Sequence, residues 1–153
     1  MINEHEKYMQ LAVREAEKAG QKDEVPIGAV VVAPGGKILA MSHNQVISLD
    51  DPTAHAEILA LRAACRKIGN YRLLNTALYV TVEPCLMCMG AILHARLKTL
   101  VFGTPDPKWG GAGSLCDFSA DSRLNHRVDV VAGVCERICR ELMQAFFRAK
   151  RIK

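Results

Sequence analysis

Residues 77–88 read ALYVTVEPCLMC, a β-rich run followed by a proline and a Cys-x-x-Cys pair. Ala77–Val82 is rich in β-branched and apolar residues and predicts a buried strand, while Pro84 favours the start of a helix. Cys85 and Cys88 are three positions apart at that helix start, so both side chains point to one side and can bind one metal ion. Such a pair also occurs in redox proteins and zinc ribbons, and the chain has no second one. A further ligand must therefore come from elsewhere in the sequence.

The remaining ligand is predicted at His55, in the motif His55-Ala56-Glu57. Asp51-Pro52 predicts the N-cap and first turn of a helix running to about Gly69, which would place this motif in its opening turns. Structural zinc is usually closed by four protein ligands, whereas hydrolytic zinc keeps three and leaves the fourth position for water. The three side chains of His55, Cys85 and Cys88 therefore predict a zinc site with an open position.

The open position and Glu57 together predict a hydrolytic reaction. Zinc lowers the pKa of a bound water to around 7, which makes hydroxide available at neutral pH. Glu57 is the candidate catalytic residue: it would take the water's proton, deliver it to the ring nitrogen beside the attacked carbon, and later protonate the departing ammonia. Both halves of the motif fall at predicted helix N-termini, where the helix dipole favours thiolates. The predicted reaction is deamination of an amino-substituted heterocycle.

A different use of the two motif cysteines remains open at this stage. A non-catalytic zinc module could combine them with His94 or Cys116, which would leave Glu57 as an ordinary surface acid. The other three cysteines, Cys65, Cys135 and Cys139, are predicted to pack in the core. Buried Cys is common, and two thiols at i, i+4 do not complete a metal site.

The rest of the chain predicts alternating helices and strands. Helices are expected over residues 4–19, 51–69, 84–94 and 136–150, and strands over residues 27–33, 38–41, 77–82, 99–102 and 127–132, with a hairpin turn at 34–36 and a Gly-rich loop at 103–114. This order, α-β-β-α-β-α-β-β-α, predicts one layered α/β domain over residues 1–153, with helices on both faces of a mixed sheet.

The composition is that of an ordinary globular domain. Of the 153 residues 50% are apolar, and the net charge of +4 only weakly favours an anionic partner. The N-terminal residues lack a secretory signal pattern, and no apolar run approaches the length of a membrane span. Six cysteines without an export signal favour metal binding in a reducing compartment over disulfides. We therefore expect a cytoplasmic protein that makes no membrane contact.

Beyond the zinc motif, the chain resembles the bacterial tRNA-specific adenosine deaminases, a branch of the zinc-dependent cytidine/deoxycytidylate deaminase superfamily. The His-x-Glu and Pro-Cys-x-x-Cys motifs mark the superfamily, and flanking stretches mark the branch. These stretches are Glu24–Val30, Asn44, Asp51–Glu57, Asn70–Leu73, Leu78–Cys85, Phe102-Gly103, Gly113-Ser114 and Asn125–Val128. The resemblance implies a three-layer α/β/α cytidine-deaminase-like fold with a central mixed five-stranded sheet. It also implies one zinc ion per subunit, a homodimer, and conversion of adenosine to inosine at the wobble position of a tRNA anticodon.

The resemblance further implies roles for residues outside the zinc motif. Asn44 would hold the flipped nucleoside, the backbone around Ala56 would meet the purine edge, and Asp106 would contact the sugar of a neighbouring nucleotide. Glu83, beside the motif, would be structural. Purely turn-forming roles for Asn44 and Asp106 stay open. The segment 104–110 departs from the family, which usually has a basic residue before the Asp and no Trp after the Lys.

An RNA loop is a physically reasonable substrate, because a base must be unstacked before a nucleophile reaches its ring carbon and unpaired anticodon bases cost least to splay out. A basic stripe on the last predicted helix would contact the RNA backbone or form a solvated face. It comprises Arg137, Arg140, Arg148, Lys150, Arg151 and Lys153. The alternative substrate is guanine, cytosine or a free nucleoside, for which the same zinc site would need no RNA-binding surface.

Overall fold

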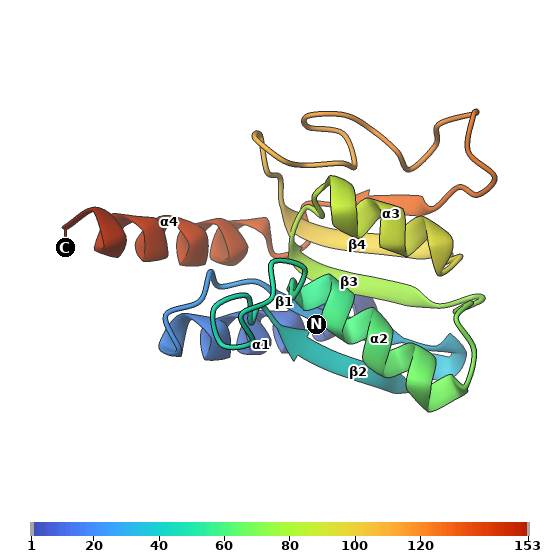
Figure 1. Ribbon diagram of the computed structural model, residues 1–153, viewed down its shortest axis with the longest axis horizontal. Helices are drawn as coiled ribbons and strands as arrows, with labels where there is room; N and C mark the ends of the chain where they lie inside the picture. Colours follow the sequence, from blue (N-terminus) through green and yellow to red (C-terminus); the bar gives the residue numbers. More distant parts are fainter. Residues whose placement is uncertain (1, 153) are drawn as a thin grey trace.

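The computed structural model describes residues 2–151 and the backbone of residue 152. Its elements follow the predicted order (Figure 1). They are α1 (Glu4–Gln21), β1 (Gly28–Val32), the short 3-10 turn η1 (Pro34–Gly36), β2 (Ile38–His43), α2 (Ala56–Ile68), β3 (Ala77–Val82), α3 (Leu86–His94), β4 (Thr99–Thr104), β5 (Asp129–Ala132) and α4 (Glu136–Ile152). Within this part of the chain, none of the helices has both the length and the apolar character that crossing a membrane requires.

The five strands form one mixed sheet in the order β2-β1-β3-β4-β5. β1 runs antiparallel to β2, as the predicted hairpin requires, and it also runs antiparallel to β3. β3, β4 and β5 run parallel, with Val80 opposite Phe102 and Phe102 opposite Ala132. The parallel pairs are joined through α3 and through the long loop after β4, because parallel neighbours need a crossover connection. The mixed five-stranded sheet is confirmed.

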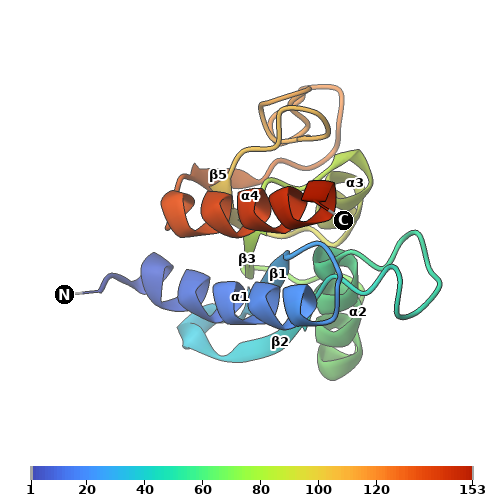
Figure 2. The ribbon, with the colours of Figure 1, turned by 90° about the vertical axis from the view of Figure 1, so that its left-hand side faces the viewer.

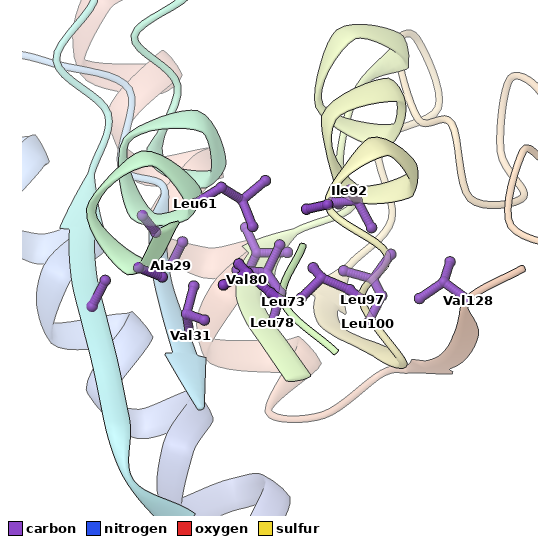
Figure 3. Packing of buried hydrophobic residues seen from close by; sticks show 14 of the residues in the cluster. Ala29, Val31, Leu61, Leu73, Leu78, Val80, Ile92, Leu97, Leu100 and Val128 are labelled. Atoms are coloured by element: carbon purple, nitrogen blue, oxygen red, sulfur yellow. The ribbon is translucent and has the colours of Figure 1, made fainter. Parts of the chain in front are cut away.

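Helices cover both faces of this sheet. On one face α2 and α3 enclose a core that includes Ala29, Val31 and Val80 (Figure 3). On the other face α1 and α4 lie side by side (Figure 2) and pack against Val30 and Tyr79. Side chains alternate along β1 because successive residues of a strand point to opposite faces. The result is the expected three-layer α/β/α architecture.

Two helices begin later than the sequence predicts. α2 starts at Ala56 with His55 as N-cap, because the Asp51 carboxylate accepts hydrogen bonds from the Thr53 N–H at 2.8 Å and the Thr53 hydroxyl at 2.7 Å. Asp51 therefore closes a local turn instead of capping the helix. α3 starts at Leu86, so Cys85 is its N-cap and Pro84 lies outside it.

Four chain segments meet at one edge of the sheet. β3 and β4 both end there because they are parallel, and the antiparallel pairing of β1 brings its beginning to the same edge. The end of β2 lies at this edge too, because His43 pairs with Gly28 at the beginning of β1. Ligand sites of α/β proteins lie preferentially outside the carboxyl ends of parallel strands. The two predicted metal motifs lie at this edge, at the starts of α2 and α3.

Candidate metal centre and active site

The three predicted ligands come together. His55 Nδ1 lies 3.6 Å from Cys85 Sγ and 3.5 Å from Cys88 Sγ, and the three ligand atoms lie within 4.8 Å of one another. Zinc bonds of about 2.0 Å to nitrogen and about 2.3 Å to sulfur, at tetrahedral angles, would separate the nitrogen from each sulfur by roughly 3.6 Å. The donor set and its spacing fit a zinc ion.

The cluster lies at two helix starts, and hydrogen bonds between its members shift their pKa values. His55 and Cys85 are the N-caps of α2 and α3. Neither helix start has a capping hydrogen bond from a side chain of the described residues. Hydrogen bonds from Cys88 and His55, opposed by partial burial, lower the pKa of Cys85 to about 4. The hydrogen bond to Cys85 raises the pKa of His55. A thiolate at Cys85 is the form that binds metal.

Glu57 lies in the first turn of α2 and is 3% exposed. Burial raises the pKa of its carboxyl group to about 7, and the carboxyl group interacts with the Cys88 thiol. Its Oε1 atom has no hydrogen-bond partner within residues 2–152. Buried polar atoms usually have partners, so an orphaned one calls for an explanation. A carboxyl group of this kind, beside a metal-binding cluster, is suited to exchange protons with a bound substrate near neutral pH.

Among the described residues, neither alternative ligand belongs to the cluster that could hold a metal. His94 is exposed at the C-terminal end of α3, and Cys116 lies in the loop after β4, where it pairs with the backbone of Gly110 and Gly113. Cys65 packs partly buried against the α2–α3 core, as predicted. Cys135 and Cys139 belong to the core under α1 and α4, also as predicted.

The residues predicted to bind substrate lie around the same edge. Asn44 follows β2 and is buried, with its side-chain Oδ1 unpartnered among the described residues. Its backbone N–H donates to Ile27, which lines one cavity together with His55. Ala56 is fully buried at the first position of α2. Asp106 lines that cavity too, but its Oδ1 accepts the N–H groups of Lys108 and Trp109, so the carboxylate also closes a turn.

Two buried glutamates organise the loops beside the site. Glu83 accepts N–H hydrogen bonds from Asp106, Ala112 and Ser114, and another from the Ser114 hydroxyl. This supports the structural role expected for it. Glu24 accepts the N–H groups of Ile47 and Ser48 and the Ser48 hydroxyl. Burial raises the pKa of Glu24, but these hydrogen bonds outweigh it and the pKa lies below its usual value. Sequence reasoning missed Glu24, because its partners are 23 and 24 positions away.

The basic stripe on α4 is partly neutralised by acidic neighbours. Arg137 pairs with Glu141 at 3.1 Å and Arg140 with Glu136 at 3.2 Å along the same helix. Lys150 reaches Asp23 at 2.7 Å. Arg148 and Arg151 are exposed, while Lys153 lies outside the described residues. The stripe therefore presents less uncompensated charge than its sequence suggests.

The chain is similar to known deaminases over nearly its whole length. A family model for MafB19-like deaminases matches residues 3–151. The chain is 48% identical over 146 residues to the tRNA-specific adenosine deaminase of Haemophilus influenzae, covering 95% of this chain and 84% of that protein. It is 45% identical over 152 residues to the tRNA-specific adenosine deaminase of Bacillus subtilis, covering 99% and 94% of the two chains. A solved structure from a study of A-to-I editing by tRNA:A34 deaminases at the wobble position of transfer RNA matches with a TM-score of 0.86 and 45% identity, over 89% of this chain and 98% of that one. The chain belongs to the tRNA-specific adenosine deaminase family.

Proposed function

We propose that this chain catalyses hydrolytic deamination of adenosine to inosine at the wobble position of a tRNA anticodon. The observation that carries the proposal is the three-ligand cluster of His55, Cys85 and Cys88. Beside it is the buried Glu57 carboxyl group, whose Oε1 has no hydrogen-bond partner within residues 2–152. The family supplies the substrate: the relatives from Haemophilus influenzae and Bacillus subtilis are named tRNA-specific adenosine deaminases. The proposal assigns residues 1–153 to one deaminase domain.

His55, Cys85 and Cys88 would hold one zinc ion per subunit through Nδ1 and two Sγ atoms. When bound, a zinc ion in a three-ligand site supplies a water whose pKa is near 7. Glu57 Oε1 would accept the proton of that water. The same carboxyl group would pass that proton to the ring nitrogen beside the attacked carbon. It would then take a second proton, from the hydroxyl group on the attacked carbon, and deliver it to the leaving amine. The balance is adenosine plus water giving inosine plus ammonia.

The polar groups around the cavity would position the nucleoside. Asn44, whose buried Oδ1 has no partner in the described part of the chain, is assigned to hold the flipped nucleoside. The start of α2 at Ala56 offers backbone N–H groups to the purine edge, since the first N–H groups of a helix lack partners within it. Asp106 is assigned to the sugar of a neighbouring nucleotide. These roles predict that Asn44→Ala weakens binding of the stem-loop without loss of zinc.

Activity on defined substrates tests the proposal. Zinc-loaded protein is incubated with an anticodon stem-loop carrying adenosine at the wobble position, and in parallel with free adenosine, cytidine and guanine. The matched control stem-loop has guanosine at the wobble position and adenosine elsewhere. We expect inosine only in the first RNA. Product from a free base or nucleoside alone would overturn the RNA substrate but keep the mechanism.

Glu57→Gln separates catalysis from a purely structural metal site. The variant should retain one zinc per chain, measured by atomic absorption, and lose deamination. Unchanged activity in this variant would contradict the catalytic role of Glu57 and favour a non-catalytic zinc module.

We also propose that the active form is a homodimer that acts in the cytoplasm, where tRNA is found. Large apolar side chains exposed on α3, Leu86 at 39% and Met87 at 37%, support an interface near the site. Sedimentation analysis should give twice the chain mass of 16.8 kDa. A single species of chain mass at every concentration would contradict the dimer.

A further inference from the structure

The cavity at the metal cluster has an aromatic rim. It has a volume of about 480 Å³ and is lined by residues that include His55, Cys85, Asp106 and Trp109. Trp109 is the only tryptophan of the chain, and 61% of its surface is exposed. Placing a large apolar ring in water costs free energy relative to burying it, so its exposure beside a polar site needs an explanation.

Trp109 belongs to a closely packed loop. The Asp106 N–H donates to Glu83 Oε1 at 3.1 Å, and the Gly111 N–H donates to the Pro84 carbonyl at 2.8 Å. A Cβ on Gly110 would lie 2.4 Å from Glu83 Oε2, so only glycine allows this approach. The Trp109 N–H donates to Asp106 Oδ1 at 3.3 Å. The backbone on both sides of Trp109 is therefore anchored to the residues next to Cys85.

The surroundings of the ring suit a nucleotide. Lys108, next to Trp109, is exposed and can approach a phosphate, because the Asp106 carboxylate accepts only its backbone N–H. Unpaired bases of RNA are recognised by stacking on exposed aromatic side chains. Because the backbone at Trp109 is already anchored, mainly the side-chain torsions would have to be ordered on binding.

Resting on the proposed function, we propose that Trp109 stacks on an unpaired nucleobase adjacent to the adenosine in the cavity. Lys108 faces the neighbouring phosphate. Trp109 is then a specificity-determining residue: it favours anticodon loops whose neighbouring base can be splayed onto the indole. Purines, with the larger ring surface, are the preferred neighbours.

Kinetics with matched variants test the stacking. Trp109→Ala should lower kcat/KM for the stem-loop by about 5- to 150-fold, the range expected for losing one stacked base. Trp109→Phe should recover most of the loss and Trp109→Leu little of it, because leucine is apolar but has no ring face. Tyr71→Ala, which removes an aromatic side chain that is 66% exposed outside this cavity, is the control and should leave kcat/KM unchanged.

Stem-loops lacking one base on either side of the wobble adenosine identify the partner. When the base that stacks on Trp109 is removed, wild-type protein and Trp109→Ala should have equal kcat/KM. Binding is followed independently by tryptophan fluorescence in the Glu57→Gln background, where the single indole should be quenched by the intact RNA and not by the RNA lacking that base. Lys108→Ala should leave the kcat/KM difference and the fluorescence quenching dependent on the same base. It should reduce the salt dependence of binding.

The outcomes separate this inference from the proposed function. Normal inosine formation with equal kcat/KM for wild type and Trp109→Ala would overturn the inference alone. A loss in Trp109→Ala that is independent of the neighbouring bases and accompanied by dissociation of the dimer would also overturn it, in favour of a subunit contact. Absence of inosine with wild-type protein would overturn both.

Discussion

In each of two cysteine pairs of this chain, the first cysteine immediately precedes a helix and the second lies in its first turn. Cys85 is the N-cap of α3 and Cys88 lies in its first turn, whereas Cys135 immediately precedes α4 and Cys139 lies in its first turn. The backbone differs at the first member: Cys85 is extended, with φ of −74°, while Cys135 is left-handed, with φ of 54°. Sequence spacing alone, i, i+3 against i, i+4, hardly distinguishes them.

Their neighbours account for the difference. His55 Nδ1 lies within 3.6 Å of both sulfurs of the first pair, and Glu57 interacts with Cys88. Cys139 instead packs so tightly under β4 that a Cβ on Gly103 would lie 2.4 Å from its Sγ. Burial raises the pKa of Cys139 to about 12, so this thiol stays protonated. The first pair can form a metal site because another part of the fold supplies a nitrogen ligand, His55.

The largest effect is expected from breaking the first pair. Cys85→Ser should reduce bound zinc from about one ion per chain to nearly none, and deamination should fall by at least about 10³-fold, because metal catalysis supplies several kcal/mol. Metal content and inosine formation measure the two effects. Full zinc occupancy in this variant would contradict the assignment of Cys85 as a ligand.

Glu57→Gln should have the next largest effect on activity. Deamination should fall by about 10²- to 10⁴-fold, the usual contribution of a general acid–base group. Zinc content should match the wild type, because the amide removes the proton acceptor and leaves His55 and the two sulfurs in place. Single-turnover rates at saturating stem-loop separate this loss from weaker binding.

The second pair, Cys135 and Cys139, should contribute to the stability of the fold and not to zinc binding. Cys139→Ser places a hydroxyl where the side chain is 1% exposed, and should lower the free energy of unfolding by about 1–3 kcal/mol. Denaturant titration measures the change. Zinc content per folded chain serves as the control, and a loss of zinc in Cys139→Ser would show that the two pairs are not independent.

Cys135→Ala should have the smallest effect. The side chain is only partly buried, so we expect the free energy of unfolding to change by about 0.5 kcal/mol or less. Cys135→Gly is the sharper comparison, because glycine adopts a positive φ without strain and should offset the lost packing. A large destabilisation by both variants would mean that Cys135 has a partner beyond the apolar core.

Local sequence signals were enough to predict most of the fold and the central part of the site. Alternating β-rich and helical stretches predict the element order, because strand and helix periodicities are local properties. His55, Glu57 and the Cys85–Cys88 pair are recognisable because metal chemistry restricts ligand type and spacing.

Other features depend on segments that meet only in the folded chain. The sequence around Asp51 predicts a helix cap, yet its carboxylate accepts hydrogen bonds from Thr53 instead. Glu83 and Asp106 are 23 positions apart and form one loop anchor. The place of Trp109 at the cavity follows from that anchor and from the parallel pairing of β3 and β4. Hydrogen bonds between distant segments carry no local pattern, so only the assembled sheet edge reveals them.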